Sequence, residues 1–297
     1  MCRRFWLLPL LAVSQQSFAK ELDPRSYINI PIDQNFIGAL YIKTKGDVYT
    51  TPDVPVEDLT LDIDGPGVAY AYTFSMFGNA SKFDIASGQA CADGEAIYLG
   101  ERVERRYCGM TDTFMRLNYN FYGAKAMELS EFVKQPKTMV IGASLQVGMP
   151  TGAYDKQYVL NIGSNRWFFK PEIGMSIPFG NWEFDAAVSA KFFTNNSELL
   201  YDQTFEQDPV YNIQSHLIYD FQPGHWIAFN ANYYFGGDTY VDGDKRADKT
   251  GNFRGGITYS YAINSQHSVK FIANKGITTK RGNDVDVVAV AWAYRWQ

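Results

Sequence analysis

The sequence predicts an all-β protein, a transmembrane antiparallel up-and-down β-barrel of about twelve strands that follows an N-terminal signal peptide. Three observations predict it. Apolar and small or polar residues alternate over segments of about ten residues, aromatic residues lie near the segment ends, and long connections alternate with short ones. A period of two indicates a strand with one apolar face, and a closed sheet with that face outward can cross a bilayer.

The first nineteen residues resemble a secretory signal peptide. Arg3 and Arg4 are basic, residues 5–13 form an apolar run too short to span a membrane, and Ser17-Phe18-Ala19 fits a small-x-small cleavage site. Cleavage would leave Lys20 as the first residue of a single barrel domain, residues 20–297. An uncleaved membrane anchor is the alternative.

Composition supports a barrel and argues against a nucleic-acid partner. Aromatic residues make up 16% of the chain, including 20 Tyr and 21 Phe, as expected for lipid-facing strands with interfacial rings. The strands of a secreted β-sandwich would also alternate apolar and polar residues, but their solvent-exposed faces would carry more charges. Loss of residues 1–19 would leave 25 basic and 32 acidic residues, a net charge of −7, and no basic run suggests nucleic acid.

The first four strands are predicted by the alternation of apolar with small, polar or charged side chains in four segments. Residues 35–45 alternate weakly, whereas residues 67–76 place valine and aromatic rings opposite alanine, threonine and serine. Residues 82–85 and 115–121 place apolar side chains opposite lysine, aspartate, arginine and asparagine. The weak alternation of residues 35–45 does not define where the first strand begins and ends.

The next four strands alternate more regularly. Residues 139–148 oppose aliphatic side chains to glycine, serine and glutamine. Residues 166–176 and 182–192 oppose tryptophan, phenylalanine and aliphatic residues to arginine, lysine, glutamate and aspartate. Residues 211–221 oppose tyrosine, isoleucine and leucine to polar residues that include a histidine.

The last four strands complete the ring. Residues 227–235 and 253–261 set aromatic and isoleucine side chains against asparagine, glycine, threonine and serine. Residues 268–275 follow a short turn, and residues 287–296 alternate valine and aromatic rings with alanine. Twelve is even, so both termini would lie on one side, the periplasm; ten or fourteen strands remain alternatives.

The connections fit this topology, with short turns on the periplasmic side and long loops outside. Short turns are expected near residues 78, 180, 223 and 265, and residues 122–136 are expected to hold a short helix. The long loops are expected at residues 47–64, 91–110, 150–164, 195–208, 237–251 and 277–284.

Cys91 and Cys108 fall in one of these predicted loops. In an exported protein that meets an oxidising periplasm, a disulfide closing the loop is the natural interpretation, although spacing alone leaves two free thiols possible.

Charged and titratable residues on the inward faces are the candidate functional residues. They could line a constriction that selects solutes, or they could pair across the interior and hold the barrel closed. These candidates are Arg116, Lys170, Glu172, Glu183, Asp185, Lys191, His216, Asp220 and Arg254.

The sequence gives little support for a catalytic role, a cofactor or a bound metal ion. Ser215 points away from His216, whose nearest same-face neighbour is Gln214, and His267 and Ser268 point to opposite faces. The histidines lack metal-site spacing, and no nucleotide-binding motif is present. Four aspartates within residues 238–248 could hold a cation, but a solvated loop explains them as well.

Several motifs carry a family resemblance. They are Pro24-Arg25-Ser26-Tyr27-Ile28-Asn29-Ile30-Pro31, Gly148-x-Pro150-x-Gly152-x-Tyr154, Asn161-x-Gly163-x-Asn165-Arg166-Trp167 and Trp292-x-Tyr294-Arg295-Trp296. In their order and spacing they resemble the outer-membrane family named for the meta-pathway of phenol degradation, which is labelled transporter-like. The resemblance implies a Gram-negative outer-membrane barrel for uptake of aromatic or other hydrophobic compounds, without catalytic residues. The cysteine-containing stretch departs from the pattern.

We therefore expect a passive channel and no enzyme. The expected partners are outer-membrane lipid and lipopolysaccharide, the barrel-assembly machinery, periplasmic chaperones and small hydrophobic solutes. A barrel with a closed interior, acting as an enzyme or a surface-interaction protein, is the alternative.

Overall fold

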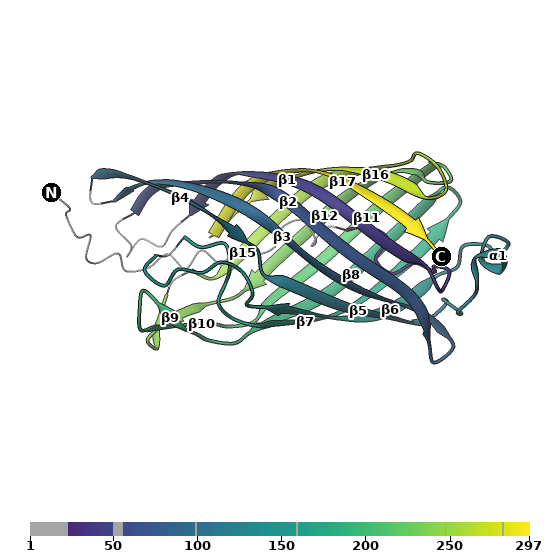
Figure 1. The fold of residues 1–297 in the computed structure, drawn as a ribbon, viewed down its shortest axis with the longest axis horizontal. Coiled ribbons are helices and arrows are strands. Elements are labelled where there is room, and N and C mark those ends of the chain that lie inside the picture. The colour runs from purple at the N-terminus through teal and green to yellow at the C-terminus, as the bar shows by residue number, and fades with distance from the viewer. Residues whose placement is uncertain (1–22, 50–55, 99, 159, 247, 281) are drawn as a thin grey trace.

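The computed structural model describes residues 23–49, 56–98, 100–158, 160–246, 248–280 and 282–297, so the expected signal peptide, residues 1–19, lies outside the described residues. The described chain forms a closed antiparallel barrel (Figure 1). Its wall has twelve strands: β1 (Asn35–Tyr49), β2 (Val56–Met76), β3 (Asn79–Tyr98), β5 (Thr113–Tyr122), β6 (Val140–Met149), β7 (Phe168–Phe179), β8 (Trp182–Phe193), β11 (Val210–Gln222), β12 (His225–Gly236), β15 (Thr250–Ala262), β16 (His267–Thr278) and β17 (Gly282–Trp296).

Closure joins the first strand to the last. β1 pairs with β17 over its whole length, with Asn35 opposite Trp296 and Tyr49 opposite Gly282, and its other edge pairs with β2. Every wall strand therefore has a neighbour on both sides, which satisfies the backbone amides that a bilayer leaves without water. The predicted fold class and strand number are confirmed.

The remaining elements lie at the two ends of the barrel (Figure 1). β4 (Glu101–Met110) follows the outer half of β3, and a separate sheet contains β9 (Asn196–Leu199), β10 (Gln203–Gln207), β13 (Thr239–Val241) and β14 (Asp244–Lys245). We call this the outer end. The inner end carries the tight turns, the C-terminus and the short predicted helix, α1 (Leu129–Phe132). In the part of the chain described, no helix is long and apolar enough to cross a membrane.

The wall has its apolar face outward. On β17, Val290 and Trp292 are 48% and 39% exposed, whereas polar residues such as Asn118, Thr258 and Asn232 on other strands are almost fully buried. Aromatic rings meet near the inner end, where Tyr294 stacks on Trp296. A polar interior inside an apolar band is the pattern of a membrane-spanning barrel.

The tight turns near residues 78, 180, 223 and 265 lie where they were predicted. At the first, Phe77 and Gly78 both have positive φ, 50° and 80°. Positive φ at both central residues defines the two-residue turn whose twist matches that of paired strands. The Phe77 side chain is 87% exposed, and its ring meets the Tyr119 ring edge-on, with 5.9 Å between their centroids.

Several predicted loops proved to be strands. Residues 91–110 form the hairpin of β3 and β4, and β1 and β2 extend into residues 47–64, with residues 50–55 outside the described part. The predicted loops at 195–208 and 237–251 contain the short strands of the outer sheet. Alternation failed there because strands beyond the lipid need no apolar outward face.

The expected disulfide is present, but its two cysteines lie on paired strands and not in an irregular loop. Cys91 on β3 and Cys108 on β4 lie directly opposite each other in the hairpin, with Cα atoms 4.0 Å apart. The bond ties together two strands that already pair, at the point where the hairpin leaves the wall.

An arginine placed in the apolar band should destabilise the barrel strongly. Val290 faces lipid between Tyr41 and Phe271, so Val290→Arg should cost about 2–4 kcal/mol of unfolding free energy in phospholipid vesicles. Asp286 lies on the same face of β17 beyond the band, with a side chain 59% exposed, and Asp286→Arg serves as the control. Equal losses in denaturant titrations of the two variants would contradict a lipid-facing Val290.

Candidate functional site

The chain ahead of β1 folds back into the barrel interior. We call residues 23–34 the N-terminal segment. At the inner end the Asp33 amide donates to the Thr73 carbonyl at 2.8 Å, and the Thr73 amide donates to the Gln34 carbonyl at 3.0 Å. Ile30 and Ile32 pack against the buried residues Ala80, Ala124 and Val140. The segment is thereby fixed to the wall before it runs further inside.

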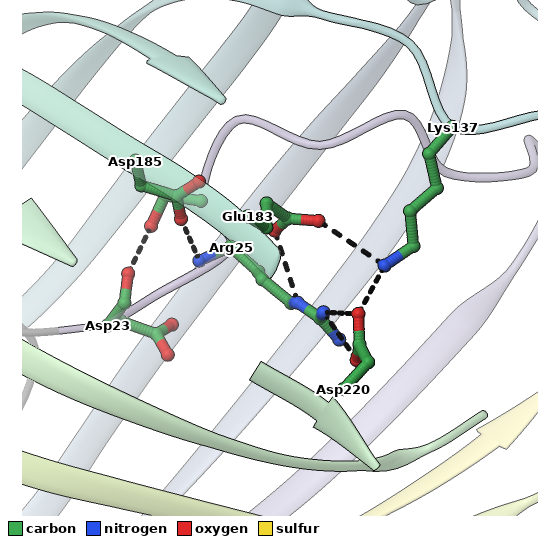
Figure 2. Close-up of polar contacts among 7 residues, drawn as sticks. Asp23, Arg25, Lys137, Glu183, Asp185 and Asp220 are labelled. Atoms are coloured by element: carbon green, nitrogen blue, oxygen red, sulfur yellow. Dashed lines mark hydrogen bonds and ion pairs between the residues drawn. The ribbon is translucent and has the colours of Figure 1, made fainter. Parts of the chain in front are cut away.

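Arg25 is the centre of a charged cluster, drawn in Figure 2. Its guanidinium donates from Nε to Glu183 at 3.2 Å and from Nη2 to both carboxylate oxygens of Asp220 at 2.7 Å. Its backbone amide donates to Asp185 at 2.7 Å. Lys137, from the connection that carries α1, reaches the same Glu183 and Asp220 (Figure 2). Glu183 and Asp220 thus share two cations, one of them from the N-terminal segment, and Asp185 accepts from the backbone of that segment.

Tyr27 anchors the segment further in. Only 3% of it is exposed, and its hydroxyl donates to Glu172 at 2.9 Å and contacts the Ser144 hydroxyl at 3.0 Å. The ring occupies a slot that two glycines leave open, since a Cβ on Gly142 or Gly174 would lie 2.8 or 2.3 Å from ring carbons. The sequence therefore shapes the wall to this side chain.

Hydrogen bonds to the backbone of the N-terminal segment and to its first residue, Asp23, also attach the segment to the wall. Asn118 and Asn120 on β5 donate side-chain amides to the carbonyls of Ser26 and Ile28, both at 3.1 Å. Lys270 on β16 donates to Asp23 at 3.1 Å. The wall holds the segment through side chains alone along this stretch, rather than by adding it as a strand.

The other candidate residues also lie on the inward face. Lys170 lies 3.4 Å from Glu172, and Arg254 donates to the Val285 carbonyl at 2.6 Å. Lys191 lies over the Phe168 ring at 4.1 Å, and the Nδ1 atom of His216 lies 2.8 Å from the Asn230 amide oxygen.

Arg116 belongs to the same inward set. Its Nε donates to Asp84 at 3.2 Å, and the arginine is only 5% exposed. The pair lies midway along the wall, on neighbouring strands β3 and β5. Most of the candidate charges are therefore paired with partners inside the barrel.

The outer end of the interior has a different lining. Val48, Leu61, Ala92 and Ile162 form a buried apolar cluster, in which the connection between β6 and β7 packs against the outer parts of β1, β2 and β3. Asp112 fixes this connection by accepting from the amides of Gly152 and Ser164 at 2.9 Å. The interior thus holds an apolar cluster at its outer end and the Arg25 cluster at its inner end.

Sequence reasoning missed the N-terminal segment, although the motif of residues 24–31 was visible. It also missed Lys137 and Lys270, and it left Arg166 out of the candidates. A polar, aperiodic stretch between a cleavage site and the first strand was the available signal. Among the described residues, no group of three or more histidine, cysteine or acidic side chains could hold a metal ion.

Known proteins share this architecture. The family described as "Putative MetA-pathway of phenol degradation" matches residues 104–283. An outer membrane channel from Pseudomonas putida F1 superposes with a TM-score of 0.73 at 16% identity, covering 93% of this chain and 100% of that one. The β domain of the Bordetella autotransporter BrkA gives 0.55 at 12% identity, covering 89% and 100%. No curated protein matches the chain. At these identities the structural likeness is one of fold.

Loosening the N-terminal segment should change the current through the barrel. Arg25→Gln removes charged hydrogen bonds that contribute about 1.5–3 kcal/mol, and Gly174→Ala fills the Tyr27 slot. Both should raise the conductance in planar bilayers. Arg25→Gln should also favour cations, because Glu183, Asp185 and Asp220 would then face Lys137 alone.

The matched control is Lys134→Gln, which removes an exposed charge from the same connection as Lys137. It should leave conductance and ion preference unchanged. If Arg25→Gln and Gly174→Ala both behave like this control, the N-terminal segment does not obstruct the interior.

Proposed function

The chain belongs to the family described as the putative MetA-pathway of phenol degradation, and from that premise we propose that it is a passive channel for small hydrophobic or aromatic compounds in the outer membrane of a Gram-negative bacterium. The observation that carries the proposal is the N-terminal segment. It occupies the inner end of the interior, yet its residues 23–28 are held there by side-chain contacts instead of strand pairing.

A segment held in this way can leave without breaking the wall. β1 begins at Asn35 and the backbone bonds to the wall begin at Asp33, so residues 23–31 can move while all twelve strands stay paired. Removing the segment would open the interior where Glu183, Asp185 and Asp220 meet. Solutes would then diffuse along the barrel without energy from the chain, filtered by width and charge.

The lining supports the class of solute. Apolar and aromatic side chains at the outer end, among them Leu61, Ile162 and Phe168, favour compounds with an apolar body. The charged residues along the interior would form the constriction. We assign that role to Arg116, Lys170, Glu172, Glu183, Asp185, Lys191, His216, Asp220 and Arg254, together with Arg25.

The outward charges support the placement in the membrane. Lys43 and Asp62 lie 3.7 Å apart, and Lys275 and Asp286 3.4 Å apart, on the outward face beyond the apolar band. They would meet the lipopolysaccharide headgroups. Such a barrel would reach the outer membrane with periplasmic chaperones and the barrel-assembly machinery, after removal of residues 1–19.

The alternative is a barrel that stays closed, as an enzyme or a surface-interaction protein. The pairing of Arg25, Lys170 and Arg116 with inward carboxylates favours it, because charges that are paired with one another stabilise a closed interior and require no solute. Catalysis gains no support from His216, whose hydrogen-bond partner is the Asn230 amide and not a carboxylate.

Uptake in cells should separate the two functions. A deletion strain should take up a dilute aromatic compound more slowly than the parent, and glucose uptake should be unchanged. The intact gene should restore the rate, and Arg25→Gln should exceed it. Equal aromatic uptake with and without the protein would favour the closed barrel.

A further inference from the structure

A second group of cations lies at the outer end of the interior, against aromatic rings. Arg166, just ahead of β7, and Lys191, on β8, both lie over the Phe193 ring, at 4.1 and 5.4 Å from its centroid. Phe168 and Phe205 complete the aromatic wall, with Lys191 4.1 Å from the first and Arg166 4.8 Å from the second. Two positive charges thus share one apolar surface.

Arg166 is buried without a carboxylate partner. It is 5% exposed, and its Nη2 donates to the side-chain oxygen of Gln207 at 2.6 Å. Its Nη1 has no hydrogen-bond partner among the described residues. Burial lowers the pKa of the guanidinium, and the attraction of Asp112 opposes that shift only in part.

Asp112, the acid whose charge acts on Arg166, already accepts hydrogen bonds from other groups. One of its oxygens accepts from the Gly152 amide, and the other accepts from the amide and hydroxyl of Ser164, at 2.9 and 2.6 Å. By contrast, Arg25 and Arg116 each hold a carboxylate. Leaving a buried guanidinium without one costs free energy, which a site for an anion would explain.

The contact with Gln207 indicates how an anion would fit. A neutral amide oxygen satisfies one donor of the guanidinium fork, whereas a carboxylate has two oxygens and satisfies two donors at once. Gln207 belongs to β10 of the outer sheet, and its own amide donates to the Gly237 carbonyl at 3.4 Å. A ligand carboxylate would therefore compete with Gln207 for Nη2 and reach Nη1 as well.

We propose that Arg166 binds the carboxylate of small aromatic acids at the outer end of the interior, with the ligand ring beside the aromatic wall of Phe168, Phe193 and Phe205 and the Gln207 side chain displaced. Lys191 adds positive charge on the same wall. This inference rests on the proposed function, since it names the solutes that the channel would collect, but binding itself requires no passage.

Isothermal titration calorimetry on the full-length chain in detergent tests the site by measuring the binding of benzoate, benzyl alcohol and inorganic phosphate. Benzoate should bind at least about tenfold more tightly than benzyl alcohol, and Arg166→Gln should abolish that preference. Arg102→Gln, which removes an exposed arginine from the β3–β4 hairpin, should preserve it. Equal binding of benzoate and benzyl alcohol, or phosphate binding as tight as benzoate, would overturn the proposal.

A second variant keeps the test decisive if Arg166→Gln fails to fold. Gln207→Ala removes the competing acceptor and leaves Arg166 in place, so benzoate should bind several-fold more tightly; unchanged or weaker binding would contradict the site. Conductance of Arg25→Gln reports passage independently. Passage without benzoate binding refutes this inference alone, and benzoate binding without passage refutes the channel alone.

Discussion

The structure depends on one constraint: no backbone amide may be left without a partner in lipid. A sheet meets it only by closing, and here closure is the pairing of β1 with β17 along their full lengths. Closure divides every wall strand into an outward and an inward face. The outward face must be apolar in the membrane, so polar and charged residues collect inside, where Asn118, Thr258 and Asn232 are almost fully buried.

The polar and charged side chains inside the barrel must then find hydrogen-bond and ion-pair partners there. The chain uses its own N-terminal segment for this purpose at the inner end, where Arg25 joins Glu183 and Asp220 and where Tyr27 reaches Glu172. The outer end uses apolar packing around Leu61 and Ile162 instead. This difference along the axis connects the fold to the proposed channel, which requires the inner segment to move and assigns the solutes with an apolar body to the outer end.

Much of this architecture could be predicted from period-two alternation, and the failures have physical causes. The wall was predictable at segments such as β17, because lipid imposes an apolar outward face. Beyond the lipid that requirement ends: Lys43 and Asp62 face outward, and alternation does not predict the β3–β4 hairpin. The position of Arg25 was not predictable, since its partners on β8 and β11 are 158 to 195 residues away in sequence. Nor did alternation distinguish Arg166, which is inward like Lys170 and whose Nη2 donates to the neutral Gln207 side chain.

The most direct test is amide hydrogen exchange of the lipid-embedded protein at the seam where β1 meets β17. A closed ring makes these strands as interior to the sheet as β7 and β8, so amides of residues 36–44 and 287–294 should exchange as slowly as those of β7 and β8. Fast exchange along one edge of β1 or β17, with β7 and β8 still protected, would mean an open sheet and would contradict the barrel on which the channel depends.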